Sequence, residues 1–424
     1  MRVAHLLRKC DPAEWGGTET AIQRLFEGLQ QHGVVSVVHC PRLNNGRDDA
    51  ADSDPLVEAG CPVRRYRAMV PIWGLSRREK QRHVAVGGNL MSFDLFRSLW
   101  KEPEVSLIHT HTLGRLGGIA SAIARRRGLP LVVTIHGGLL DLPEALKNDF
   151  QKATIGGFDW GRVFGLLLQS RRLLEHADAI LTCNPKEAAL LQQQNPGKRV
   201  QVQPHGVPMA LYQKDHRAAA HEAFPQIEDC PVLLCVGRID PVKNQDWLVT
   251  EATEIFKKHP KAMLVLAGGC TDDAYGESLR QQIQKSKLQD RVLMVGNLPS
   301  GDPRLIGLFQ LAQAVILPSI SETFGLVILE AWAAGTAVIA SRTSGACALI
   351  QHGENGWLFD LNNPSAFHDA VALTLGFPRL RGRLANAGHQ VVASEYDVTA
   401  VAGRVKQLYE QLIEAKHALR HSAR

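Results

Sequence analysis

Short apolar runs alternate with longer segments of helical periodicity through the first half of the chain. The runs, rich in β-branched residues, predict buried strands at residues 34–38, 105–108, 131–135, 179–182 and 200–202. Helical patterns lie between them at residues 18–31, 114–127 and 166–176. This alternation is typical of βαβ units, in which helices cover both faces of a parallel sheet.

The same alternation restarts in the second half of the chain. Strand-like runs recur at residues 232–237, 263–268, 292–296, 314–317 and 337–340. The sequence therefore predicts an α/β protein with two doubly wound domains, at residues 1–207 and 208–395. The intervening stretch 204–231 is rich in Pro, Gly and charge, which suits a linker. A last helical pattern starts near Val398, and we expect residues 396–424 to pack back on the first domain.

Composition places this chain among globular proteins. Of its 424 residues 45% are hydrophobic, which is enough for substantial cores. No apolar run approaches the roughly 18 residues of a membrane span, and charge interrupts the first nine residues too early for a signal peptide. We therefore expect a cytoplasmic protein. Its eight cysteines are scattered, and we expect buried thiols, because the spacing of Cys230 and Cys235 fits neither a redox pair nor a zinc site.

The net charge of +6 is concentrated in one window. Residues 64–82 hold seven basic side chains against the single acidic Glu79, so the rest of the chain is neutral. Nucleic acid is not an expected partner, because binding through phosphates needs a wider basic face and a recognisable motif. The window is either a solvated loop and helix or, since Tyr66, Ile72 and Trp73 interleave with its charges, a segment contacting an anionic membrane or a phosphorylated acceptor.

Two sets of residues suit phosphate binding. Gly16 and Gly17 precede a helical run, so backbone amides there face an anion or simply form a tight turn capped by Thr18. Arg238 and Lys243 follow the strand at 232–236, at the edge where open α/β sheets bind ligands. A bidentate Arg and a Lys suit a diphosphate, although a surface pair is the plainer interpretation.

Two glutamates carry the strongest signal. Glu322 lies in the loop after the strand at 314–317, and Glu330 follows eight positions later inside an otherwise apolar helix. A buried carboxylate is costly unless it is hydrogen-bonded. The two adjacent hydroxyls of a ribose would satisfy it.

In combination these motifs resemble glycosyltransferase family 4, a family of enzymes with the GT-B fold that use nucleotide sugars. The similarity covers nearly the whole chain. It is carried by Gly16-Gly17, His109-Thr110-His111, Thr134-Ile135-His136-Gly137, Gly237-Arg238 with Lys243, the pair Glu322 and Glu330, and Gly353-Glu354-Asn355-Gly356. The resemblance implies two Rossmann-like domains facing across a cleft, with donor binding in the second.

The resemblance also implies roles for single residues. Arg238 and Lys243 would hold the donor diphosphate, Glu330 the ribose, and Glu322 the donor sugar. Catalysis would rest on these two cations with Glu322 and His136. Further donor contacts would come from Gly17, Phe324, Gly325, Leu326, Asn297 and Leu298, and the acceptor or sugar cleft would be lined by Gly16, His111 and His136.

The family retains anomeric configuration and needs no cofactor beyond its nucleotide sugar, for which uridine is favoured and guanosine comes next. The acceptor would be a glycan, a lipid-linked molecule or a small molecule, in the synthesis of polysaccharide, lipopolysaccharide or glycoconjugate, with the enzyme possible at the cytoplasmic face of a membrane. One departure stands out. After Ser344-Gly345 the family usually has a second Gly and then an acidic residue, whereas this chain has Ala346-Cys347.

Two other function classes stay open, a nucleotide-sugar epimerase or hydrolase and a non-catalytic scaffold that binds nucleotide sugars. A metal site is not expected. His109 and His111 would share one face of a strand, but no third ligand has compatible spacing. Asp52-Ser53-Asp54 matches a metal-binding D-x-D pattern yet reads as a solvated turn, as does Asp272-Asp273.

Overall fold

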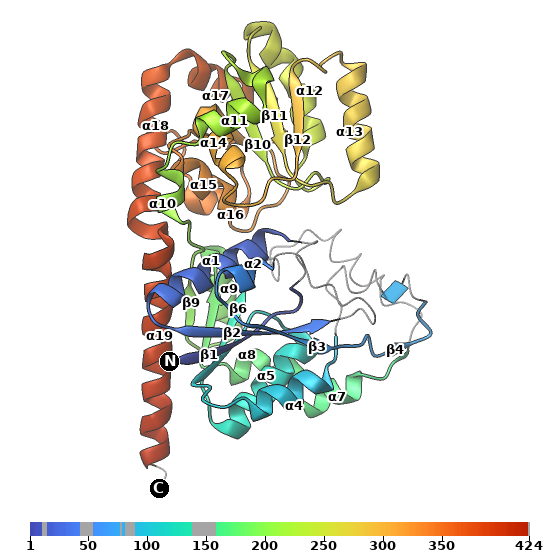
Figure 1. The fold of residues 1–424 in the computed structure, drawn as a ribbon, viewed down its shortest axis with the longest axis vertical. Helices are drawn as coiled ribbons and strands as arrows, with labels where there is room; N and C mark the ends of the chain where they lie inside the picture. The colour runs from blue at the N-terminus through green and yellow to red at the C-terminus, as the bar shows by residue number, and fades with distance from the viewer. Residues whose placement is uncertain (11–14, 43–53, 77–78, 81–89, 138–157, 423–424) are drawn as a thin grey trace. The chain divides into compact units, whose positions relative to one another are not determined.

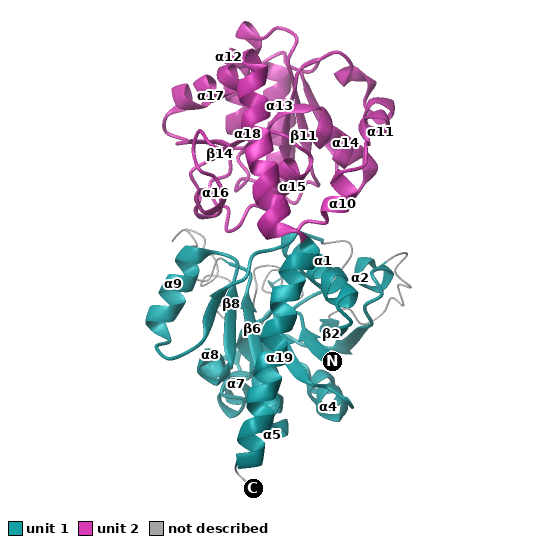
Figure 2. Ribbon diagram, turned by 90° about the vertical axis from the view of Figure 1, so that its left-hand side faces the viewer, with its two compact units in different colours: residues 1–206, 398–424 teal, residues 207–397 magenta. Residues whose placement is uncertain are grey.

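The computed structural model describes residues 1–10, 15–42, 54–76, 79–80, 90–137 and 158–422. These residues form two compact units, shown in different colours in Figure 2. Unit 1 comprises residues 1–206 together with 398–424, and unit 2 comprises residues 207–397. The boundaries expected from the sequence were at 207 and 395.

Unit 1 is built on a seven-stranded sheet with the order β3-β2-β1-β5-β6-β8-β9 (Figure 1). Every neighbouring pair in it is parallel. The strands are β1 (Arg2–Leu6), β2 (Val35–Arg42), β3 (Val63–Arg67), β5 (Leu107–Thr110), β6 (Leu131–Ile135), β8 (Ala179–Thr182) and β9 (Val200–Val202). A separate antiparallel pair joins β4 (Ile72–Trp73) to β7 (Phe158–Asp159).

Alternate residues of these strands feed two cores in unit 1. Ile108 belongs to one core with side chains of α4 (Phe93–Lys101) and α5 (Gly114–Arg127). Leu107 belongs to the other core, with side chains of α1 (Gly17–Gln31) and α19 (Val398–Ser422). Helices thus cover both faces of the sheet, as parallel sheets require. Shorter helices are α2 (Pro55–Glu58), α7 (Arg162–Leu167), α8 (Leu173–His176) and α9 (Pro185–Gln194).

The C-terminal helix α19 packs on α1, although the two are far apart in sequence. Gly28 makes this possible. A Cβ on Gly28 would lie 2.6 Å from Cβ of Ala402 and 2.7 Å from the carbonyl oxygen of Val398. The two helices therefore approach more closely than any larger residue would permit.

Unit 2 has a six-stranded parallel sheet with the order β12-β11-β10-β13-β14-β15. Its strands are β10 (Val232–Val236), β11 (Met263–Ala267), β12 (Val292–Gly296), β13 (Ala312–Leu317), β14 (Val338–Ser341) and β15 (Trp357–Phe359). Its helices include α12 (Gln245–Lys258), α13 (Asp273–Lys285), α14 (Pro303–Leu311), α15 (Leu326–Ala333), α16 (Ser344–Leu349), α17 (Pro364–Gly376) and α18 (Pro378–Val391). The predicted α/β class with two doubly wound sheets is confirmed.

The predicted linker at 204–231 is wrong. It contains α10 (Met209–Tyr212), α11 (Arg217–Ala223) and a 3₁₀ turn at Pro225–Ile227, and all three belong to unit 2. The reason is tertiary. Gly307 of α14 leaves room for α11, because a Cβ there would lie 2.3 Å from the carbonyl oxygen of His216 and 2.8 Å from Ala220 Cβ.

The helix predicted at 166–176 is also interrupted. The structure has α7, a 3₁₀ turn at Ser170–Arg172 and then α8. Gln169 adopts a left-handed φ of 51°, which ends the first helix. The turn then lies against α5 at Gly118, where a Cβ would come within 2.1 Å of Ser170 Oγ.

Two further expectations concern the cysteines and the absence of a membrane span. Five of the eight cysteines are buried, but Cys270 and Cys347 are exposed and Cys230 is half-buried. Among the described residues, none of the helices combines the length and apolar character that crossing a membrane requires.

Candidate active site

Glycines end three adjacent strands of unit 2 at the carboxyl edge of its sheet. Gly237 and Gly268 directly follow β10 and β11, and Gly296 closes β12. Their φ angles are 155°, 154° and 75°. A Cβ on Gly268 would lie only 1.9 Å from the carbonyl oxygen of Gly237, so glycine alone fits there. The turns that follow these strands are thereby drawn together at one edge, where α/β sheets bind ligands.

The turn after β10 is shaped by Asp240, a residue that the sequence did not single out. Its Oδ1 accepts the backbone N–H groups of Val242 and Lys243, at 3.0 and 3.1 Å. Its Oδ2 lies 3.1 Å from the guanidinium of Arg238, whose side chain is 56% exposed. Asp240 thus contacts the side chain of Arg238 and the backbone of Lys243. An Asp before a Pro is typical of turns, and this was the local signal in the sequence.

Lys243 and Glu322 form an ion pair, with Nζ 2.5 Å from Oε2. The loop that carries Glu322 is held by the start of α16. Ser344 Oγ and the Gly345 N–H both donate to the carbonyl oxygen of Glu322, at 3.2 and 2.8 Å. A Cβ on Gly345 would lie 2.6 Å from Phe324 N and 2.8 Å from that oxygen. The two residues that depart from the family motif, 346 and 347, follow Gly345. The glycine that this close contact requires is therefore still present.

The other predicted donor residues follow along α15. Gly325 caps this helix in a left-handed conformation with φ of 91°, and Leu326 begins it. Phe324 is buried, and Glu330 is 6% exposed in the middle of the helix. After β12, Asn297 is exposed and Leu298 half-buried. Asn297 lies beside the Gly269 turn.

In unit 1 a cavity of about 370 Å³ lies at the carboxyl ends of β1, β5 and β6 and at the start of α1. His111 and His136 both line it, with the remaining lining given by Leu7, Arg8, Lys9, Thr18, Glu19, Ile22, Leu113, Thr134, Ile135 and Gly137. Gly16 and Gly17 precede Thr18 but are not among the lining residues. The Gly16 N–H donates to Glu19 Oε2 at 3.1 Å, so Glu19 and not Thr18 caps α1.

The histidines of this cavity contact one another. Nδ1 of His111 lies 2.9 Å from Nε2 of His136, and the ring of His205 stacks on His136 with centroids 5.5 Å apart. Burial lowers the pKa of His136 to about 4 and that of His205 to about 3, helped at His205 by His136 and Arg24. All these rings are therefore neutral near pH 7. The sequence placed His205 in a linker, so its part in this cluster was missed.

Comparison with known proteins assigns the family. The model for glycosyl transferases group 1 matches residues 217–391, and that for the glycosyl transferase 4-like domain matches residues 16–206. A D-inositol 3-phosphate glycosyltransferase from Kribbella flavida is 30% identical over 383 residues, which cover 88% of this chain and 85% of that protein. The chain belongs to the group 1 glycosyl transferases. The family resemblance inferred from the motifs is confirmed.

Other proteins are similar to this glycosyltransferase over most of its length. D-inositol 3-phosphate glycosyltransferase 2 from Catenulispora acidiphila is 28% identical, over 96% of this chain and 92% of its own. Anabaena Alr3699/HepE, solved with UDP and glucose, has a TM-score of 0.70 at 20% identity and covers 97% of this chain and 99% of its own. Sucrose-phosphate synthase from Thermosynechococcus elongatus has a TM-score of 0.72 at 24% identity, over 98% and 99%. These structures confirm the predicted GT-B fold.

A third histidine joins the two that were weighed as metal ligands in this glycosyltransferase. His5 pairs with His109 across β1 and β5, and ring nitrogens of His5, His109 and His111 lie within 4.8 Å of one another. The expectation that no third ligand is available was therefore wrong. Both nitrogens of His109 are nevertheless engaged, at 2.6 Å each, by Tyr409 Oη and Thr134 Oγ1. A metal ion would have to break these hydrogen bonds.

The D-x-D pattern lies mostly outside the described residues, which include only Asp54. This side chain is 7% exposed, accepts the Leu56 N–H at 3.0 Å and pairs with Arg65, so it is not a solvated turn residue. Asp272 is exposed and caps α13 through the Tyr275 N–H. Both acidic side chains thus have structural roles in their own elements.

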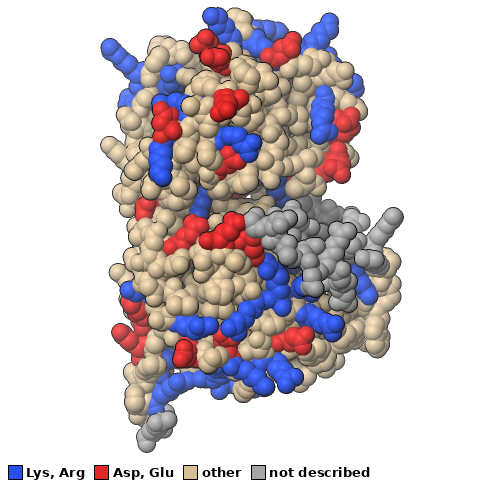
Figure 3. Space-filling view, in the orientation of Figure 1, with Lys and Arg blue, Asp and Glu red and all other residues tan. Residues whose placement is uncertain are grey.

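The first residues of the basic window 64–82 form a strand, and not the solvated loop and helix that was one of its two interpretations. Arg64 and Arg65 lie in β3, where Arg64 pairs with the buried Glu102 and Arg65 with Asp54. Figure 3 shows acidic side chains among the basic ones on the drawn face of unit 1. Arg77, Arg78 and Arg82 lie outside the described residues. Two of the seven charges are thus neutralised inside the fold.

Proposed function

We propose that this glycosyltransferase takes its sugar from a nucleoside diphosphate sugar, with uridine preferred over guanosine, and retains the anomeric configuration. The observation that carries the proposal is the grouping of Arg238, Lys243 and Glu322 at one edge of the unit 2 sheet. Arg238 offers a planar fork and Lys243 a point charge, which together suit the two phosphates of the donor. The Anabaena neighbour is described in complex with UDP and glucose, which supports this choice.

The same residues support a mechanism without a covalent intermediate. Glu322 is committed to its ion pair with Lys243 and is poorly placed to act as a nucleophile. The two cations can instead stabilise the negative charge that grows on the departing diphosphate, usually the largest catalytic term. Retention would follow from attack on the face that the diphosphate leaves, with a phosphate oxygen accepting the proton of the acceptor hydroxyl.

The acceptor belongs in the unit 1 cavity and carries an anionic group. Arg8 and Lys9 line this cavity together with one carboxylate, Glu19 in the first turn of α1. The two cations outnumber that carboxylate, and the start of the helix also favours an anion. The two curated relatives described above are named for D-inositol 3-phosphate, a phosphorylated polyol. A phosphorylated small molecule and a lipid-linked phosphate share this chemistry, so both belong in the test.

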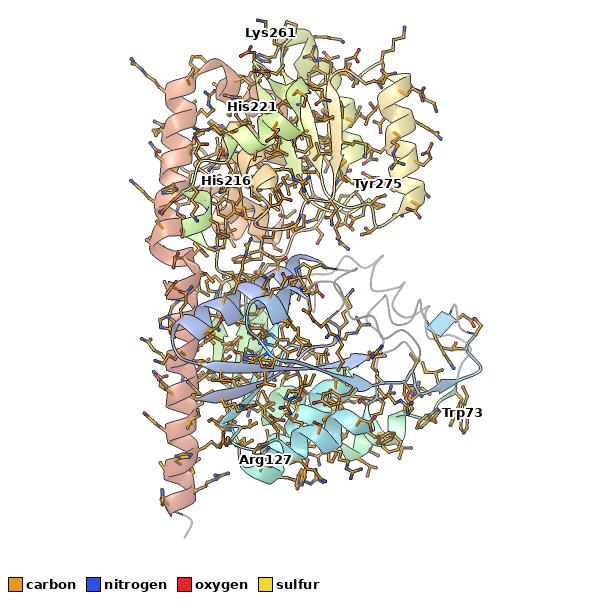
Figure 4. The ribbon with its side chains drawn as sticks, in the orientation of Figure 1. Trp73, Arg127, His216, His221, Lys261 and Tyr275 are labelled. Atoms are coloured by element: carbon orange, nitrogen blue, oxygen red, sulfur yellow. The ribbon has the colours of Figure 1, made fainter. Side chains whose placement is uncertain are left out.

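A membrane contact is better carried by an apolar patch in unit 1 than by the basic window. We define the aromatic patch as Trp73 and Phe158, which are 66% and 67% exposed. Trp73 stacks on Phe158 across β4 and β7, with centroids 5.9 Å apart, and lies at the edge of unit 1 in Figure 4. Nearby α7 buries none of its residues. Adjoining exposed apolar side chains, such as these two stacked rings, mark interaction surfaces.

Release of nucleoside diphosphate tests the donor and the reaction together. UDP-glucose and GDP-mannose would be supplied with and without inositol phosphate or a lipid phosphate. A transferase releases nucleoside diphosphate only with the right acceptor, a hydrolase releases it without one, and an epimerase changes the sugar nucleotide and releases none. An inverted anomer in the product, seen by NMR, would refute retention.

Lys243→Ala and Lys261→Ala make a matched pair for this assay. Lys261 is exposed before β11, at the upper end of unit 2 in Figure 4, away from the carboxyl edge. We expect Lys243→Ala to lower kcat/KM by about 10²-fold or more, as for loss of one preorganised charge, and Lys261→Ala to change it by less than about 2-fold. Equal rates in the two variants would overturn the site.

A further inference from the structure

Three imidazoles in unit 1 are joined in a row by hydrogen bonds. Nδ1 of His5 lies 3.1 Å from Nε2 of His111, and Nδ1 of His111 lies 2.9 Å from Nε2 of His136. The rings come from the end of β1 and from the turns after β5 and β6. Within the described part of the chain, the two outer nitrogens, Nε2 of His5 and Nδ1 of His136, are buried and have no hydrogen-bond partner.

Each ring in this row is neutral. Burial is the main cause that lowers the pKa of His5, His111 and His136 below the usual value, and the histidines around them add to the effect at His5 and His111. A neutral imidazole has one N–H and one lone pair, so three rings share three protons. Each of the two hydrogen bonds holds one proton, and the third must sit on an outer nitrogen.

Only two proton arrangements keep both hydrogen bonds. In one, every ring is protonated at Nδ1, so His136 has an N–H at its outer nitrogen and His5 has a lone pair. In the other, every ring is protonated at Nε2, so His136 has a lone pair and His5 has the N–H. Moving the proton at the outer nitrogen of one end therefore moves the proton at the outer nitrogen of the other end.

We propose that His5, which does not line the cavity, sets through His111 whether the outer nitrogen of His136 carries a lone pair or an N–H. The proposal rests on the proposed function in that it places a substrate beside His136. His111 and His136 line the cavity of unit 1, and His5 lies behind them with 0% exposure. His5 is thus a positioning residue. In the Nδ1-protonated row the outer nitrogen of His136 is a hydrogen-bond donor, and in the Nε2-protonated row it is an acceptor.

The surroundings of the row favour coupling inside it. The ring of His109 lies 4.1 Å from that of His111, but Tyr409 and Thr134 already engage both of its nitrogens. Other groups that act on the row include His39 from β2 and His205 after β9, and Arg24 of α1 acts on His205. The apolar ring of Phe26 lies against His5, with centroids 4.4 Å apart.

Nitrogen NMR of the full chain, with labelled histidine, tests the proposal directly, because protonated and unprotonated ring nitrogens have well-separated shifts. In the unmodified protein His111 and His136 should be protonated at the same ring position. His5→Phe keeps a ring against Phe26 but removes the first hydrogen bond, so the proportion of the two tautomers at His136 should change. Different protonated positions in the unmodified protein, or unchanged His136 signals in His5→Phe, would overturn the proposal.

Kinetics supply the second readout. His5→Phe should lower kcat about 10-fold or more, which is less than the ~10²–10³-fold lost with a donor that acts directly on the reacting group, and should leave the donor KM within about 2-fold. His5→Asn keeps a hydrogen-bonding atom near the position of Nδ1 and should restore most of kcat. His417→Phe, at an exposed position on α19, is the control and should match the unmodified protein.

If the unmodified protein transfers no sugar, the proposed function fails while the NMR comparison still decides the coupling. A His5→Phe variant that loses kcat and shows unchanged His136 signals would refute the coupling alone. The two failures are therefore distinguishable.

Discussion

Lys243 and Glu322 are 79 residues apart in sequence, and their side chains meet at 2.5 Å. Both are about four-fifths buried, with 21% and 19% exposed side chains. One residue follows β10 and the other follows β13, and these strands are neighbours in the sheet. The pair therefore fixes the Lys243 ammonium where a donor phosphate would bind, so the two side chains should act as a unit.

A double-mutant cycle tests that coupling. Lys243→Met and Glu322→Gln should each lower kcat/KM about 10²-fold, and the double variant should be little worse than Lys243→Met alone. Residues in contact typically show coupling free energies of roughly 0.5–3 kcal/mol. The measurement is kcat/KM for the donor in all four proteins. Additive losses would mean that Glu322 acts on the sugar independently of Lys243.

Gly345 should be intolerant of the smallest side chain. A Cβ there would lie under 3 Å from backbone atoms of Thr323 and Phe324, so Gly345→Ala must push the Glu322 loop away from α16. We expect the donor KM to rise at least several-fold and the free energy of unfolding to fall by about 1–3 kcal/mol. Calorimetry and donor titration would measure the two effects.

Gly382→Ala is the matched control. Gly382 lies inside α18 and has open space around its Cα. Alanine should stabilise that helix by up to about 1 kcal/mol and leave the donor KM unchanged. A Gly345→Ala protein as active and as stable as this control would show that the loop yields, and that its fixed shape is unimportant for donor binding.

Much of the fold follows from local pattern, because buried parallel strands are short apolar runs. The strands predicted at 131–135, 179–182, 200–202 and 292–296 have the same bounds in the structure. β1 was missed since Arg2 and His5 interrupt its apolar pattern, although His5 is fully buried. A hydrogen bond to His111 offsets the free-energy cost of burying the polar ring of His5. No local sequence pattern reveals that hydrogen bond.

The candidate site, like the fold, could be predicted only in part from local patterns. Motifs pointed to Lys243, Glu322 and His136 individually, because family motifs record residue types at fixed spacing. Their partners depend on strand order. His5 reaches His109 and His111 only because β1 pairs with β5 in the register that sets His5 beside His109. α11 likewise needs the gap at Gly307, far along the chain.

The aromatic patch predicts binding to anionic vesicles. The double variant Trp73→Ser and Phe158→Ser should lose most sedimentation with vesicles of phosphatidylcholine and phosphatidylglycerol, because buried apolar area drives interfacial binding. Phe377→Ser, which removes a 59% exposed aromatic ring from unit 2, should bind normally. Equal sedimentation of both variants, or none by the unmodified protein, would contradict a membrane role for this patch.

Turnover should not require a divalent cation. In the proposed function Arg238 and Lys243 bind the diphosphate, and these two cations would take the part that a metal ion plays elsewhere. Activity in excess chelator should therefore equal activity in its absence, with the Lys261→Ala protein as a reference for assay quality. Complete loss that Mg²⁺ or Mn²⁺ restores would show that a metal is essential.

Unit 1 should lose stability as the pH falls from about 6.5 toward 4. Burial, with Arg64 and Arg2, lowers the pKa of His39 to about 4, and burial lowers that of His136 to about 4 as well. The unfolded chain takes up protons near its ordinary pKa of about 6.5 while the folded rings stay neutral. The unfolded state thus binds more protons in this window, so acid favours unfolding by at most about 3 kcal/mol for each ring.

His39 allows this to be checked away from the cavity. Its ring is fully buried and its Nδ1 lies 3.0 Å from Tyr66 Oη, a contact that the amide of His39→Asn can replace without titrating. The drop in melting temperature between about pH 7.5 and about pH 5 should be smaller for His39→Asn than for the unmodified protein. For His417→Asn the drop should equal that of the unmodified protein. If His39→Asn is as acid-sensitive as His417→Asn, the His39 ring is not excluded from protons in the folded state, and its burial does not drive the acid response.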